Sequence, residues 1–166
     1  MPRTSIRHRM RAIAQKRFTA VGLDEPSKAT SGSVLVFTRT KHRARGLGEK
    51  LVKSGYRATS IQGNLSQGQR KKAMDGFRSG RFQIMVATDI AARGIDVTRI
   101  SHVINYDIPD TPEAYIHRIG RTGRAARSGD AFTLTTNEDM GMVRSIERLL
   151  AKPLERRRLE DFDYDA

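Results

Sequence analysis

Several residue types and patterns are absent from this sequence, and each absence removes a class of protein. The 166 residues include no cysteine, so disulfide bridges and thiolate metal sites are excluded. A chain without cysteine fits a reducing compartment, and we expect a cytoplasmic protein. No apolar run approaches the length of a membrane-spanning helix. The arginine-rich N-terminal segment also lacks the apolar core of a secretory signal.

Acidic residues are scarce relative to basic ones. The chain has 31 Lys and Arg against 18 Asp and Glu, which gives a formal net charge of +13. This excess favours a polyanionic partner, and nucleic acid is the first candidate. Aromatic residues make up 6% and hydrophobic residues 37% of the chain, so we expect a modest core. The length fits one domain, which we expect to be monomeric in isolation.

Composition divides the chain into three regions. Residues 1–32 form a basic segment in which apolar residues fall at helical spacing, which predicts an amphipathic helix from about Ser5 to Val21. Its basic face fits a solvated surface better than an arm that touches RNA. Residues 33–152 carry the main domain. Residues 153–166 mix both charges and are expected to be an irregular tail.

Five short apolar segments alternate with predicted helices in the main domain. The predicted strands are Ser33–Phe37, Arg57–Ile61, Gln83–Ala87, His102–Tyr106 and Asp130–Thr135. Helices are predicted from Thr40 to about Ser54, from Ser66 to about Ser79, from Thr111 into the arginine-rich segment, and from Glu138 to about Leu150. This alternation predicts a single α/β domain, a parallel sheet flanked by helices on both faces.

The segment Tyr115–Arg124 concentrates basic residues beyond any need of packing. Arg118, Arg121 and Arg124 recur every three residues where a helix runs into a glycine-broken loop, so they can point roughly the same way. Guanidinium groups gathered on one side suit phosphate or carboxylate oxygens. A solvated basic helix end is the alternative.

Polar segments follow three of the predicted strands. They are residues 37–40, 62–64 and 88–96, rich in Thr, Arg, Gly and Asp. Ligands of open α/β sheets bind at the carboxyl ends of the strands, so these segments are expected to share one edge. Each alone could be a turn or a helix cap. Together they suit a phosphodiester backbone, to which hydroxyls, backbone N–H groups and arginines donate without reading a base.

Four segments in this order resemble the motifs of a known family, the C-terminal RecA-like domain of DEAD-box RNA helicases in superfamily 2. Val34–Thr40 is similar to motif IV, and Gly63 with Gln67–Arg70 to motif IVa. Val86–Asp96 is similar to motif V, and His117–Arg124 to motif VI. Gln62 departs from the family, which most often has histidine before the glycine. The lysine and leucine pattern that the family usually carries in the helix before the first strand is not found in residues 1–32.

The resemblance implies a role for each matching residue. Residues expected to lie on the RNA backbone path, or to orient the loops that do, are Thr38, Arg39, Gly63, Gln67, Arg70 and Thr88. Gly94 and Asp96 would approach the ribose of ATP. Arg121 and Arg124 would be arginine fingers for its γ-phosphate. Residues expected at the interface with a partner domain are Arg93, His117 and Arg118, the last two linking to its carboxylates.

The resemblance thus implies the second motor domain of an ATP-dependent RNA helicase, which closes with an N-terminal RecA-like domain to unwind duplexes locally. The sequence contains neither a Gly-x-x-x-x-Gly-Lys-[Ser/Thr] loop nor an Asp-Glu-Ala-Asp run. In this family the N-terminal domain carries both, so ATP and Mg²⁺ are expected to be held mainly there, and this chain alone is expected to be inactive. A stand-alone RNA-binding or chaperone module and a DNA-directed motor are the alternatives.

Overall fold

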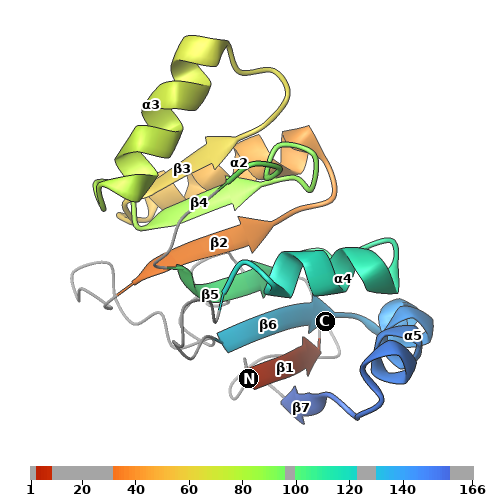
Figure 1. Cartoon of the computed structure of the whole chain (residues 1–166). Helices are drawn as coiled ribbons and strands as arrows, with labels where there is room; N and C mark the ends of the chain where they lie inside the picture. The colour runs from red at the N-terminus through yellow and green to blue at the C-terminus, as the bar shows by residue number, and fades with distance from the viewer. Residues whose placement is uncertain (1–2, 9–31, 96–99, 123–129, 158–166) are drawn as a thin grey trace.

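A seven-stranded parallel sheet forms the centre of the computed structural model, which describes residues 3–8, 32–95, 100–122 and 130–157 (Figure 1). The strands are β1 (Arg3–His8), β2 (Ser33–Phe37), β3 (Ala58–Ile61), β4 (Ile84–Ala87), β5 (Ile100–Asn105), β6 (Asp130–Thr135) and β7 (Glu155–Arg157). Their order across the sheet is β3-β4-β2-β5-β6-β1-β7. The five strands predicted from the sequence are therefore neighbours, and their bounds agree to within a few residues.

Local capping signals fix where the helices begin. The helices are α2 (Lys41–Lys53), α3 (Gln67–Arg78), α4 (Pro112–Ile119) and α5 (Met140–Leu150), with a short 3-10 helix η1 (Asn137–Asp139) before the last. Thr40 caps α2, Ser66 and Gln69 form the predicted capping box of α3, and Thr111 caps α4 ahead of Pro112. None of the described helices is long and apolar enough to cross a membrane.

The buried strand β2 divides the core between the two faces of the sheet. Val34 and Val36 pack with residues of α2 in one cluster. Leu35 and Phe37 point to the other face and pack with Phe77 of α3. Because successive side chains of a strand alternate between faces, α2 and α3 cover opposite sides of the sheet. The prediction of helices on both faces is confirmed.

Helices α4 and α5 form a third apolar cluster beside β6. Tyr115 of α4 and Val143 of α5 are fully buried there together with Ala131 of β6. Ala131 is in register with Val103, which belongs to the cluster under α3. Helices α4 and α5 therefore cover the same face of the sheet as α3, along its other half (Figure 1).

The two ends of the sequence depart from the predictions. Residues 3–8 form strand β1 between β6 and β7, so the predicted helix from Ser5 is wrong at its start. The rest of that helix lies outside the described residues. Residues 155–157 form the edge strand β7, where an irregular tail was expected. The sheet therefore includes residues on both sides of the range 33–152.

Candidate functional site

The polar segments predicted at one edge of the sheet do follow neighbouring strands. Strands β3, β4 and β2 are consecutive in the sheet and parallel, so the loops that leave their carboxyl ends lie at the same edge. Strand β5 is the next neighbour of β2, and the loop after it joins this edge. The described residues of all four loops form the candidate site.

A pocket of about 330 Å³ lies between α3 and the loop after β4. Its lining includes Gln67 and Arg70 from α3 with Arg93 and Gly94 from the loop. Gly94 has a φ of 77°, which glycine adopts without strain. The structure thus brings together residues assigned by resemblance to RNA, to the interface and to the nucleotide.

The rim of this pocket is cationic. Arg70, Arg78 and Arg93 line it, and within the described part of the chain no carboxylate pairs with any of the three. Asp75, the carboxylate in the lining, is engaged by Lys71. A pocket with unpaired guanidinium groups and an exposed glycine backbone suits a phosphate group.

The two predicted threonines each make a hydrogen bond within their own loop. Thr38 is fully buried, and its Oγ1 donates to the carbonyl of Thr40 at 3.2 Å. The Oγ1 of Thr88 accepts from the N–H of Ala91 at 3.4 Å. Arg39, in contrast, has a side chain that is 53% exposed, and Gly63 is exposed as well.

Gln62, where the family most often has histidine, is 4% exposed. Its Oε1 accepts from the N–H of Asn64 at 2.8 Å. The side chain therefore closes the turn that carries Gly63, and the substitution supplies a hydrogen bond within the loop.

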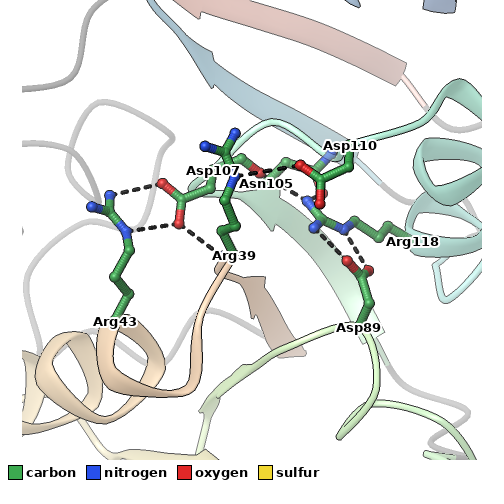
Figure 2. Close-up of polar contacts among 7 residues, drawn as sticks. All are labelled: Arg39, Arg43, Asp89, Asn105, Asp107, Asp110 and Arg118. Atoms are coloured by element: carbon green, nitrogen blue, oxygen red, sulfur yellow. Dashed lines mark hydrogen bonds and ion pairs between the residues drawn. The ribbon is translucent and has the colours of Figure 1, made fainter.

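Arg118 is the most buried cation of the site. Its Nε and Nη2 donate to Asp89 at 2.7 Å each, and its Nη1 donates to the carbonyl of Asp107 at 2.8 Å (Figure 2). Its guanidinium carbon also lies 5.0 Å from the centre of the Phe37 ring. Arg118 is 2% exposed, and all the hydrogen bonds described here are made within this domain.

Arg118 and Arg121 both donate hydrogen bonds to the loop after β4. Arg118 binds the carboxylate of Asp89, whereas the Nη1 of Arg121 donates to the carbonyl of Ile95 at 3.2 Å. Both residues thus hold the loop after β4, at different points. His117 is exposed on α4. Arg124 and Asp96 lie outside the described residues.

Asp107 is a site residue that the motifs did not indicate. Its carboxylate accepts from the Nε and Nη2 of Arg43 at 2.8 and 2.7 Å and from the backbone N–H of Arg39 at 2.8 Å (Figure 2). It comes two residues after β5, at the edge where the other polar loops lie. The same rule that drew attention to those loops could have found it.

The described residues fit part of what a bound nucleotide needs. The exposed backbone at Gly94 and the guanidinium of Arg121 come from the segments expected to face it. No group of three or more His, Asp or Glu side chains among the described residues could hold a metal ion. Gly94 and Arg121 are therefore the described residues whose chemistry suits contacts to ATP.

Comparison with known proteins gives the same class of domain. The model of the helicase conserved C-terminal domain matches residues 14–126. The DEAD-box ATP-dependent RNA helicase CshA of Geobacillus kaustophilus strain HTA426 is 48% identical over 122 residues, which are 74% of this chain and 26% of that protein. CshA of Bacillus subtilis strain 168 is 45% identical over 122 residues, 74% of this chain and 25% of that protein.

Solved structures agree with this fold. The Escherichia coli DEAD-box protein SrmB, bound to regulator of ribonuclease activity A, superposes with a TM-score of 0.83 at 31% identity and covers 95% of this chain and 91% of that one. Saccharomyces cerevisiae Dbp5 bound to RNA and ADP BeF3 gives 0.84 at 30% identity, covering 97% of this chain and 42% of that one.

The fold and the site define a RecA-like helicase domain. The chain belongs to the helicase conserved C-terminal domain family, as the C-terminal domain of a DEAD-box RNA helicase. It spans about a quarter of the length of the curated relatives named above. These relatives are helicases, so they do not favour a stand-alone RNA chaperone.

Proposed function

We propose that this domain binds the sugar-phosphate backbone of RNA along the carboxyl edge of its sheet. The observation that carries the proposal is the pocket in which Arg70 of α3 and Arg93 of the loop after β4 stand together without a carboxylate partner among the described residues. Phosphate oxygens are the natural partners of such unpaired guanidinium groups. Arg39 extends this basic edge toward the neighbouring strand β2.

The chemistry of the edge favours backbone contacts over base recognition. Arginine side chains and glycine backbone dominate its exposed part, and aromatic side chains that could stack on bases are not among the residues of the pocket. Contacts to phosphates carry no sequence information and weaken as salt rises. The structure of the relative Dbp5 bound to RNA supports RNA as the ligand.

We further propose that Arg121 and Arg124 act as arginine fingers on ATP held by an N-terminal RecA-like domain, and that Asp96 and Gly94 meet its ribose. The name of the relatives, ATP-dependent RNA helicases, supports this role. ATP would supply the energy for closing the two domains on RNA. Guanidinium groups stabilise negative charge that develops on a transferred phosphoryl group.

RNA binding is tested by titrating the chain against labelled single-stranded RNAs of unrelated sequence at two salt concentrations. We expect similar affinities for the different sequences and a marked loss at the higher salt. Arg70→Ala should weaken binding to all of them and lower the slope of log affinity against log salt by about 0.7.

Lys53→Ala is the matched control. It removes one positive charge from the exposed end of α2, whose first turn faces the site and whose last turn lies away from it. The control should bind RNA nearly as the unchanged chain does. Binding that is insensitive to salt, or equal losses in both variants, would contradict the proposed site.

A further inference from the structure

Asp107 ties the RNA-facing loop after β2 to the body of the domain. Its backbone N–H donates to the carbonyl of Phe37 at 3.3 Å, and its carboxylate accepts from the N–H of Arg39 at 2.8 Å. Arg43 donates twice to the same carboxylate. The Asp107 side chain is only 10% exposed, so these contacts fill most of its surroundings.

Asp107 also contacts the buried arginine of α4. Its carbonyl accepts from the Nη1 of Arg118 at 2.8 Å. One residue therefore joins the loop after β2, helix α2 and helix α4 (Figure 2). The backbone of Arg39 is held at its N–H, while its side chain is largely exposed at the edge.

A second carboxylate, that of Asp110, contacts the side chain of Arg39 instead of its backbone. The Oδ1 of Asp110 lies 3.5 Å from the Nε of Arg39, and both side chains are largely exposed, at 79% and 53%. A pair in that setting is weak and exchanges readily with other partners. Asp110 therefore neutralises the guanidinium that Asp107 helps to place.

We propose that Asp107 is a positioning residue for RNA binding, which acts through the backbone N–H of Arg39 and so directs the Arg39 guanidinium toward a phosphate of the bound strand. This inference rests on the proposed RNA-binding function. Asp107 itself touches no RNA, since its oxygens are occupied by Arg39 and Arg43.

The direction in which RNA affinity changes when Asp107 is removed distinguishes a positioning role from a purely electrostatic one. Removing a carboxylate near a polyanion, and releasing Arg43 from its partner, should strengthen RNA binding if charge alone matters. If Asp107 positions Arg39, removing it should weaken binding instead. Asp110 supplies the matched control, because its removal takes away the same charge and releases Arg39 without disturbing its backbone.

The experiment is a fluorescence anisotropy titration of the chain with a labelled single-stranded oligouridylate at low salt. Asp107→Ala is expected to weaken binding roughly three- to tenfold, the size expected for a lost hydrogen-bonded contact. Asp107→Asn keeps one oxygen for the Arg39 N–H and should lose less. Asp110→Ala should bind as tightly as the unchanged chain or more tightly.

A double-mutant cycle then tests whether Asp107 acts through Arg39. In the Arg39→Ala background, Asp107→Ala should cause no further loss, because effects on one shared contact are not additive. Thermal melts establish that each variant is folded. If Asp107→Ala does not fold, Asp107→Asn takes its place in the cycle and must still weaken binding in an Arg39-dependent manner.

Two results overturn the inference while RNA binding by the unchanged chain stands. One is wild-type or tighter binding by the folded Asp107 variant. The other is an equal loss with and without Arg39. A chain that shows no salt-dependent binding to the oligouridylate overturns the proposed RNA-binding function itself, and the inference with it.

Discussion

Arg118 and Asp89 form a two-point ion pair, with Nε–Oδ1 and Nη2–Oδ2 distances of 2.7 Å each. The arginine is 2% exposed and the carboxylate 47%. Asp89 belongs to the loop after β4, and Arg118 to the last turn of α4. The pair therefore fixes two family motifs to each other inside one domain, and it places Arg118 among the residues that hold the site together.

Removing the carboxylate should cost the domain much of its stability. Asp89→Ala leaves a buried guanidinium with its carbonyl contacts and no counter-charge, so we expect the free energy of unfolding to fall by about 2–3 kcal/mol. Asp75→Ala, which breaks the exposed pair with Lys71, should cost less than about 1 kcal/mol. Urea unfolding measures the free energy of unfolding of both variants. Equal losses in the two would contradict the claim that burial of Arg118 makes its ion pair the more stabilising one.

Two glycines inside helices should respond to alanine with opposite signs. A Cβ at Gly76 would lie 2.5 Å from two ring carbons of Phe82, whereas one at Gly46 would meet no heavy atom within 4 Å. We expect Gly76→Ala to lower the free energy of unfolding by about 1–3 kcal/mol. Gly46→Ala should raise it by about 0.5–1 kcal/mol, because alanine restricts the unfolded chain. A stabilised Gly76→Ala would show that Phe82 moves aside freely.

His102 should make stability depend on pH. Burial lowers the pKa of His102, although the nearby Asp130 opposes this by raising it. The unfolded chain therefore takes up a proton at a higher pH than the folded one, so this histidine destabilises the fold as pH falls through its ordinary value of about 6.5. Melting temperatures between about pH 5 and pH 8 should fall more steeply toward acid in the unchanged chain than in His102→Gln. Parallel curves would contradict this.

The elements that local signals specify could be predicted from the sequence. The caps at Thr40, Ser66 and Thr111 act within a few residues of themselves, and the apolar runs of β2 and β4 are buried on both faces. Such signals do not depend on distant parts of the chain, which explains the agreement in element bounds.

Strands β1 and β7 could not be predicted, because their pairing depends on distant residues. The sequence of β1 is Arg-Thr-Ser-Ile-Arg-His and that of β7 is Glu-Arg-Arg, so neither has the apolar pattern of a strand. β1 pairs with β6, which lies more than a hundred residues later in the sequence, on the side of β6 opposite to β5. The helical spacing of apolar residues around it therefore gave the wrong prediction for residues 5–8.

In the site, too, local sequence predicted some features, while contacts between distant residues could not be predicted. The motifs indicated which loops gather at the edge, yet the partner of Arg118 is Asp89, a residue from another loop. A cluster of arginines in sequence says nothing of which member is neutralised inside the fold. Arg118 and Thr38 thus hold the site from within, while Arg39, Arg70 and Arg93 present unburied or unpaired cations.

Arg121 should matter more for catalysis than for folding. Its hydrogen bond to the Ile95 carbonyl suggests a stability loss of about 1 kcal/mol in Arg121→Ala. In a protein that joins this domain to an N-terminal DEAD-box domain, the same change should lower kcat for ATP hydrolysis by about a hundredfold or more. RNA binding without nucleotide should be nearly unchanged. A loss of RNA binding that matches the loss of turnover would contradict a role as a finger.

We propose that this chain supplies the RNA-binding edge and the arginines of a two-domain ATPase. The most direct test measures ATP turnover with Mg²⁺ and saturating RNA, first for this chain alone and then for the chain joined to the N-terminal RecA-like domain of a DEAD-box helicase. We expect no measurable turnover from the chain alone and RNA-stimulated turnover from the joined protein. Turnover by the chain alone, or a folded joined protein that RNA does not stimulate, would contradict the account.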